Sequence, residues 1–276
     1  MRRIPASVAT QVTVTFVDGD GVAEASTGTV TCAVVDGAGT AVSSGNATSL
    51  GGGRYGFTVD TADLDVFTAT FSGAFSGDAA RSASTTFEVV GSIPLSVADV
   101  RAVDEDLDDI VKYPADTVLA EIQAAWDILE QGLRVAIVPR ASRVTYDGTG
   151  LTTLVVDQLE LRTVEAATID GSTVATSDLV VKRGGVIYRP GGWPRGHGNV
   201  ELHLTHGWSQ TPDPVVRALR TLTVDRLVSR ATPSRATSLS TDVGAFRLTI
   251  AGRDGWTGIP DVDAVIDQFG YAVGFA

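Results

Sequence analysis

The chain has 276 residues, of which 43% are hydrophobic and 20% are charged, a balance typical of a soluble globular protein with one or two domains. Its formal net charge is −12, and acidic residues outnumber Lys and Arg on both sides of residue 92, which argues against tight, salt-sensitive DNA binding. No apolar run approaches the roughly 20 residues of a membrane-spanning helix, and the first residues lack the apolar segment of a signal peptide, so we expect no membrane partner.

Residues 1–92 are predicted to form an all-β domain. Hydrophobic and polar residues alternate in short runs, which are separated by turn signals such as Asp18–Gly21 and Gly51–Gly53. The runs are Val12–Phe16, Val30–Val34, Tyr55–Val59, Phe67–Phe71 and Phe87–Val89. Short strands at this spacing predict a β-sandwich. Cys32, the only cysteine of the chain, shares a strand face with two valines, so we expect a buried thiol and assembly in a reducing cytoplasm.

A linker at Gly91–Pro94 precedes a second domain, predicted over residues 93–276, in which helical periods appear. Ser96 and Asp99 resemble a capping box, and apolar residues follow at helical spacing up to Leu107. This pattern predicts that the second domain begins with a helix.

The acidic run that contains Asp104, Asp106 and Asp108 has two interpretations, metal ligands or a solvated helix face. A calcium loop would space its ligands around a glycine, and this run has none. The solvated face is therefore favoured.

A second helix is predicted from Thr117 to Gln131, with Asp116 as its cap and Gly132 as its end. Its expected buried stripe comprises Val118, Leu119, Ile122, Trp126 and Leu129. From Arg143 to Ile169 the pattern changes to short β-strands.

A β-hairpin follows, in which Val180–Lys182 and Val186–Arg189 are joined by the turn Arg183–Gly185. Pro190–Gly192 interrupts strand pairing because proline has no N–H to donate. Alternation resumes in a strand over Asn199–His206.

Thr211 is expected to cap an amphipathic helix that begins at Pro212.

Residues 229–242 are polar and rich in Ser and Thr, a composition that predicts a mobile loop. A strand over Val243–Ile250 and a short helix from Pro260 complete the second domain, for which this mixture predicts an α+β fold.

The three histidines, His197, His203 and His206, fall within ten positions and raise the question of a zinc site. Positions 203 and 206 of one strand point to opposite faces, and the nearest acid in sequence is Glu201, so we expect no metal and no cofactor. The chain also lacks a nucleophile elbow, a Walker loop and a dinucleotide fingerprint. We therefore expect a protein that is not an enzyme.

Trp193, Trp208 and Trp256 each lie beside glycine or in a glycine- and proline-rich loop, where a ring either caps its own domain's core or anchors an interface. Arg189 and Arg195 flank the loop that carries Trp193 and suit salt bridges with an acidic neighbour.

The order of these segments carries a resemblance. A glycine hairpin leads into Tyr-Arg-Pro-Gly-Gly-Trp-Pro at residues 188–194, a strand ends in Thr-His-Gly-Trp at 205–208, and Pro-Asp-Pro at 212–214 opens a helix. Over residues 95–276 this order resembles the head-tail connector (head-completion adaptor) proteins of long-tailed double-stranded DNA phages. In those proteins a second helix ends in glycine before a positively charged segment, where this chain has Arg134 and Arg140.

The β-sandwich resembles, in architecture only, the immunoglobulin-like modules that are often fused to phage structural proteins. The cysteine pair and tryptophan of antibody domains are absent from residues 1–92.

The resemblance implies a virion protein at the head-tail junction, assembled in the host cytoplasm. Copies would form a ring, often of twelve, that joins the portal protein to a tail-proximal stopper or tail-terminator protein. DNA would pass through the lumen without sequence-specific binding, and an acidic lumen would repel its phosphates.

One hypothesis for assembly is that Arg189, Trp193 and Arg195, together with Trp208, meet the acidic run of Asp104, Asp106 and Asp108 across a subunit boundary or at the portal. One alternative function is a capsid-decorating or host-glycan-binding module built on the sandwich. Another, a carbohydrate-active enzyme, would need paired carboxylates in a cleft.

Overall fold

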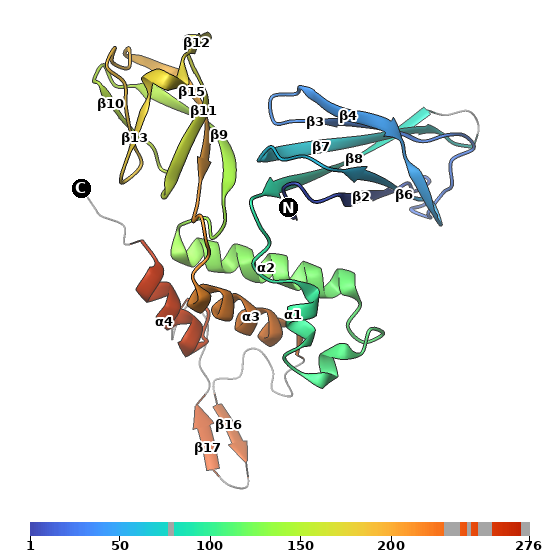
Figure 1. Cartoon of the computed structure of the whole chain (residues 1–276). Helices are drawn as coiled ribbons and strands as arrows, with labels where there is room; N and C mark the ends of the chain where they lie inside the picture. The colour runs from blue at the N-terminus through green and yellow to red at the C-terminus, as the bar shows by residue number, and fades with distance from the viewer. Residues whose placement is uncertain (77–79, 229–237, 242–243, 248–255, 272–276) are drawn as a thin grey trace. The chain divides into compact units, whose positions relative to one another are not determined.

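The computed structural model describes residues 1–76, 80–228, 238–241, 244–247 and 256–271. The chain forms two compact units, each built from several segments (Figure 1). Unit 1 comprises Met1–Ile93, Pro139–Asp157 and Leu161–His206, and unit 2 comprises Pro94–Val138, Gln158–Glu160 and Gly207–Ala276. The first break lies beside the predicted linker, but the predicted domain 93–276 contributes to both units. Independent folding of residues 1–92 and 93–276 stays a prediction.

The first part of unit 1 consists of two β-sheets, as the alternating pattern predicts. The five-stranded sheet has the order β1 (Arg2–Pro5), β8 (Ala80–Val90), β7 (Asp65–Ala74), β3 (Thr31–Val35), β4 (Ala41–Asn46). The three-stranded sheet has the order β2 (Thr10–Thr15), β6 (Arg54–Val59), β5 (Thr48–Gly51). Only β1 and β8 pair in parallel among these named strands. The immunoglobulin-like topology stays a prediction.

These two sheets share one hydrophobic core because every second side chain of a strand faces the same side. The largest members are aromatic: Phe16, Tyr55, Phe67, Phe71, Phe75 and Phe87. Cys32 lies among them, and its burial raises the pKa of the thiol to about 11. The prediction of a buried cysteine is therefore confirmed.

The rest of unit 1 holds a second core between two further sheets. One has the order β12 (Ser172–Val174), β11 (Leu161–Ile169), β15 (Gly196–His206), β9 (Arg140–Gly148). The other has the order β10 (Thr153–Val155), β14 (Val186–Tyr188), β13 (Val180–Lys182), and a 3-10 turn, η2 (Thr176–Asp178), precedes β13. The predicted hairpin is confirmed: Gly184 and Gly185 both have positive φ in the turn between β13 and β14.

The helices lie in unit 2: α1 (Val97–Arg101), η1 (Glu105–Asp108), α2 (Ala115–Leu133), α3 (Asp213–Leu227) and α4 (Pro260–Phe269). The first predicted helix ends early, because the chain leaves α1 at Ala102 and continues as the 3-10 turn η1. The Ser96–Asp99 capping box is confirmed. None of the helices in the described ranges is long and apolar enough to span a membrane.

The ends of α2 and α3 differ from the predicted ones. Gly132 lies inside α2, which ends at Leu133, and the C-cap residue Arg134 adopts positive φ. A Cβ at Gly132 would lie 2.9 Å from Cδ1 of Ile266, so the glycine allows α4 to pack closely rather than ending α2. Asp116 and Thr211 do not cap their helices; the hydroxyl of Thr211 donates to the carbonyl of Ile137 instead.

The predicted stripe of α2 is buried at four of its five positions, and the amphipathic helix predicted from Pro212 buries one face as α3. A 3.6-residue period places such positions on one side of a helix. Residues 229–237 and 242 of the predicted mobile loop lie outside the described residues. Within that loop, Ser238–Thr241 forms β16, which pairs with β17 (Gly244–Arg247). The rest of the predicted strand Val243–Ile250 lies outside the described ranges.

Gly207, which follows β15, is expected to be intolerant of a side chain. It adopts φ +97°, and a Cβ there would lie only 2.3 Å from the carbonyl oxygen of Val138. We expect Gly207→Ala to lower the free energy of unfolding by about 2–3 kcal/mol, measured by urea denaturation. Gly171→Ala is the matched control, since Gly171 has φ +74° but no atom within 4 Å of its Cβ position, and should cost about 1 kcal/mol. Equal losses would contradict the steric argument.

Candidate functional site

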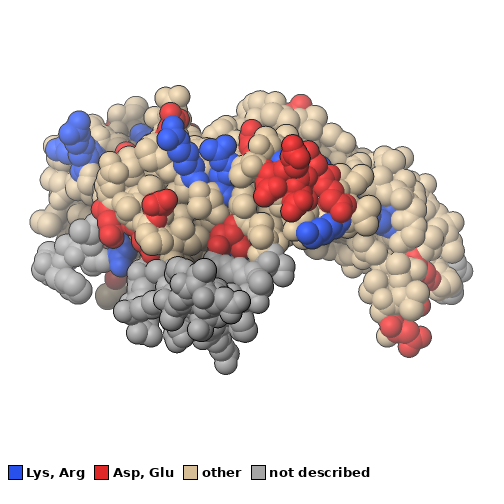
Figure 2. All heavy atoms as spheres, turned by 90° about the horizontal axis from the view of Figure 1, so that it is seen from below, with Lys and Arg blue, Asp and Glu red and all other residues tan. Residues whose placement is uncertain are grey.

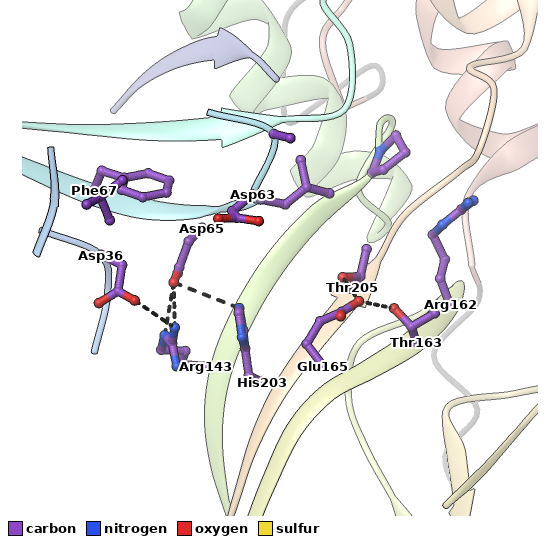
Figure 3. Close-up of a pocket in the computed structure, with 14 residues that line it drawn as sticks. Asp36, Asp63, Asp65, Phe67, Arg143, Arg162, Thr163, Glu165, His203 and Thr205 are labelled. Atoms are coloured by element: carbon purple, nitrogen blue, oxygen red, sulfur yellow. Dashed lines mark hydrogen bonds and ion pairs between the residues drawn. The ribbon is translucent and has the colours of Figure 1, made fainter. Parts of the chain in front are cut away.

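A polar pocket of about 490 Å³ lies within unit 1, lined by the start of β7 and by strands β9, β11 and β15 (Figure 3). Its charged or polar lining residues are Asp36, Asp63, Asp65, Arg143, Arg162, Thr163, Glu165, His203 and Thr205. Carboxylates, guanidinium groups and an imidazole in one cavity are the combination from which an acid–base site is made, so the pairing of these groups decides what the pocket can do.

Asp65 and Arg143 form the central pair of the pocket. The Nε and Nη2 atoms of Arg143 donate to Oδ2 of Asp65 at 3.1 and 2.7 Å, and the backbone N–H of Val66 donates to Oδ1 at 2.8 Å. Asp36 is the second carboxylate near Arg143, at 3.7 Å from Nη2. Asp65 is 5% exposed, so these hydrogen bonds supply most of the partners of its carboxylate.

Glu165 is also held by the protein. Its Oε1 accepts a hydrogen bond from the hydroxyl of Thr205 at 3.0 Å and a second one from the hydroxyl of Thr163. Asp65 is buried and paired with Arg143, whereas Glu165 is exposed and accepts hydrogen bonds from two threonine hydroxyl groups. These bonds connect β7 to β9 and β11 to β15.

A second ionic cluster in unit 1 joins β1, β8 and β9 around Glu88, which is almost fully buried. Arg140 donates from Nε and Nη2 to the two carboxylate oxygens at 2.6 and 2.9 Å, and Arg3 donates from Nε at 3.3 Å. Arg140 was predicted to belong to a positively charged segment, but its guanidinium group forms an ion pair with Glu88 inside unit 1. Arg134, the other residue of that segment, is exposed at the end of α2.

The three histidines have separate partners. His203 Nε2 lies 3.9 Å from Asp65 Oδ2, His206 Nε2 lies 2.7 Å from Ser142 Oγ, and exposed His197 lies 3.2 Å from Asp147. The acids paired with His203 and His197 come from other strands, β7 and β9. Within the described residues, no group of three or more His, Cys, Asp or Glu side chains is arranged to hold a metal ion.

His206 is expected to make the protein less stable in acid. Burial lowers the pKa of His206 from its ordinary value of 6.5 to about 4, and the nearby charge of Arg140 contributes. Between these two values the unfolded chain binds more protons at this site than the folded chain, so the free energy of unfolding falls as the pH is lowered through this window. His206→Gln should flatten this fall relative to the exposed-site control Thr149→Ala, measured by urea denaturation from pH 7 to pH 4. An unchanged slope would contradict the prediction.

The structure corrects part of the predicted interface. Trp193 is 0% exposed and packs in the second core of unit 1, where its indole N–H donates to the carbonyl of Ile187 at 3.4 Å. The ring therefore caps its own core and is not an exposed anchor. Arg189 is partly buried and donates to the carbonyl of Gly192, because the Pro-Gly-Gly turn folds the loop back on itself. Arg195 remains exposed.

Trp208 is half-buried in unit 2, with its ring edge-to-face against Phe269 at a centroid distance of 6.4 Å. Trp256 is the exposed tryptophan of the three considered, at 51%. Whether Trp208 contacts a partner stays a prediction.

The acidic side of the predicted interface is exposed. Asp104, Asp106 and Asp108 surround η1, and the side chain of Asp104 accepts a hydrogen bond from the backbone N–H of Asp106 at 3.0 Å. Figure 2 shows acidic side chains gathered in a patch on the face that it presents. The prediction that these three residues contact a partner is untested, but they are available for it.

The ionic clusters were not predicted from the sequence. Arg143 lies 78 positions from Asp65, and Arg140 lies 52 positions from Glu88, so no local spacing links the members of either pair. One signal was present: Glu88 interrupts an apolar run at the end of β8, at a position whose outward face another strand covers.

No protein-family model and no curated protein matches the chain. Among solved structures it is similar to a chain in the neck of an empty gene transfer agent (GTA) particle computed with C6 symmetry, with 17% identity and a TM-score of 0.44. It is also similar to a chain in the virion of the native GTA particle, with 17% identity and a TM-score of 0.46. Each match covers 65% of this chain and 90% of the other. At this identity and these TM-scores the likeness does not establish a common fold.

Proposed function

We propose that the chain is a structural virion protein, a head-tail connector that forms a ring at the portal vertex. The observation that carries the proposal is the order of elements: α1 and α2, the sheet of β9, β11 and β15, the β13–β14 hairpin, and α3 after Pro212. The resemblance of residues 95–276 to connector proteins implies this same order. The partners would be further copies of the chain, twelve in a ring as the family implies, the portal protein and a tail-proximal stopper or tail-terminator protein.

The charges of the chain support passage of DNA through such a ring. The net charge is −12, and Arg140 and Arg143 are both engaged by carboxylates of unit 1. A lumen with few available basic side chains would repel the phosphates and let the duplex slide. The protein would act at the head-tail junction of the virion after assembly in the host cytoplasm.

A density map of the head-tail junction of the virion tests this proposal. We expect residues 95–276 to form a ring that adjoins the portal, with few basic side chains lining the channel. Finding the protein on the capsid faces or at the distal tip of the tail would overturn the connector function.

The outer face of the five-stranded sheet favours a second candidate, a capsid-decorating or host-glycan-binding role for the sandwich. This face carries a ladder of hydroxyl groups, in which Thr70 pairs with Ser84 at 3.0 Å and Ser72 with Ser82 at 2.8 Å. Uncharged hydroxyl groups can exchange hydrogen bonds with sugars or with a protein surface. Binding of the full chain to host cell-wall glycan, lost in Thr70→Lys, would support this candidate, and equal binding by both would exclude this face.

A further inference from the structure

The first surface that suggests a partner is the acidic loop, which we define as residues 103–111 of unit 2. Ile110 and Val111 are 66% and 86% exposed, and Val103 is also exposed. The loop also presents a group of exposed carboxylates: Asp104, Glu105, Asp106, Asp108 and Asp109. Branched aliphatic side chains in such an exposed group are typical of a contact surface that is covered in an assembly.

The acidic loop is held in a fixed conformation. Leu107, within the loop, is buried. Oδ1 of Asp109 accepts hydrogen bonds from the backbone N–H groups of Val111 and Lys112 at 2.9 and 3.0 Å. The N–H of Tyr113 donates to the carbonyl of Asp109 at 2.8 Å. Because these bonds already order the backbone, docking of the loop would cost little conformational entropy.

The second surface is the basic sheet face, which we define as the outward side of the sheet β10–β14–β13 in unit 1. Leu154 and Ile187 pair across this sheet and are buried, so the residues on either side of them in each strand face outward. Val180 and Lys182 flank Val181, which lies opposite Ile187 on β13, and face the same way. Val155 and Val180 are 66% and 50% exposed. The other outward members are Thr153, Lys182, Val186 and Tyr188.

The edge of this face at the β13–β14 turn carries two basic side chains. Lys182 lies over the ring of Tyr188, with Nζ 4.6 Å from the ring centroid, and Arg183 is exposed in the turn beside it. Val155 and Lys182 both pair with Val186, so aliphatic and basic side chains share one row of the sheet. The face is thus apolar with a basic edge, whereas the acidic loop is apolar with an acidic edge.

We propose that the acidic loop of one copy docks on the basic sheet face of the next copy. The two surfaces differ and belong to the same chain, which makes the contact heterologous, the type that closes a ring. Opposite charges favour this pairing, while contact of either surface with its own equivalent would set like charges together. The inference rests on the proposed ring and replaces the loop around Trp193 as its partner surface.

Cysteine cross-linking tests the contact. Cys32 is the only native cysteine, and its buried thiol has a raised pKa, so the folded chain should react little with maleimides. We expect the full-length chain with Val111→Cys and Val180→Cys, treated with a bis-maleimide over a concentration series, to give a ladder of multimers. Each single variant alone should stay monomeric, and an equimolar mixture of the two should stop at dimers.

Three results would overturn the contact. These are a dimer from one single variant alone, a cross-link confined to one chain, and no multimer at any concentration. Lys182→Glu with Arg183→Glu should reduce the ladder by at least about tenfold, because like charges would then meet. Asp106→Lys with Asp108→Lys in the same chain should restore it, while Arg54→Glu, an exposed basic site on β6, is the control. Failure of the restoring pair would exclude the charge pairing.

The outcome is separable from that of the proposed function. A portal-vertex ring in which residues 111 and 180 of neighbouring copies do not cross-link would overturn this contact alone. A cross-linked ladder from a protein that the density map places away from the head-tail junction would overturn the connector function and leave the contact standing.

Discussion

Replacing Trp193 with alanine is expected to lower the free energy of unfolding by about 3–5 kcal/mol, as for other fully buried tryptophans. The ring is 0% exposed and packs among Leu154, Ile187 and Leu202. Its removal would leave a cavity between the sheets that meet there, and the strands of a closed core can relax into it only in part. Urea denaturation monitored by circular dichroism measures the loss.

Trp256→Ala is the matched control for this prediction. Its ring is 51% exposed, so the same truncation should cost about 1 kcal/mol or less. If Trp193→Ala lowers the free energy of unfolding no more than Trp256→Ala does, the Trp193 ring is not part of a core. The prediction that it anchors an interface would then stand again.

Replacing Glu88 with alanine is expected to lower the free energy of unfolding by about 3–5 kcal/mol. The substitution removes a buried carboxylate that accepts from Arg3 and Arg140, and both guanidinium groups would keep their charge without it. The loss is large because a charge taken out of water needs its counter-charge. The denaturation midpoint of the full chain, compared with that of the wild type, reports the effect.

Glu121→Ala removes an ion pair of similar geometry in an exposed position. Arg226 Nε lies 2.7 Å from Glu121 Oε2, and both side chains are about one-third exposed. Water screens such a pair, so its loss should cost about 0–1 kcal/mol. Similar values for Glu88→Ala and Glu121→Ala would contradict the claim that the Glu88 cluster stabilises unit 1.

The Glu88 cluster also connects two of the chain segments that make up unit 1. Glu88 and Arg140 are 52 positions apart, and the backbone N–H of Gly91 donates to the carbonyl of Pro139 at 2.7 Å. The end of β8 and the start of β9 are therefore joined by both side-chain and backbone bonds. This explains why strands of the predicted second domain group with the sandwich.

Features that depend on local period were predictable from the sequence alone. The alternating runs predicted the sandwich strands and the burial of Cys32, and the helical stripes predicted the buried faces of α2 and α3. The exposure of Asp104, Asp106 and Asp108 also followed from the charge of the run. These predictions succeed because the backbone geometry of a strand or helix fixes which side chains share a face.

Which distant residues come into contact depends on the tertiary structure. It buried Trp193, closed Arg189 onto its own loop, and paired Asp65 with Arg143 across 78 positions of sequence. It also left the outward side of β10, β14 and β13 uncovered, although a pattern of valines gives no sign of exposure. Burial and pairing of this kind depend on how distant strands pack, and no local period in the sequence encodes that packing.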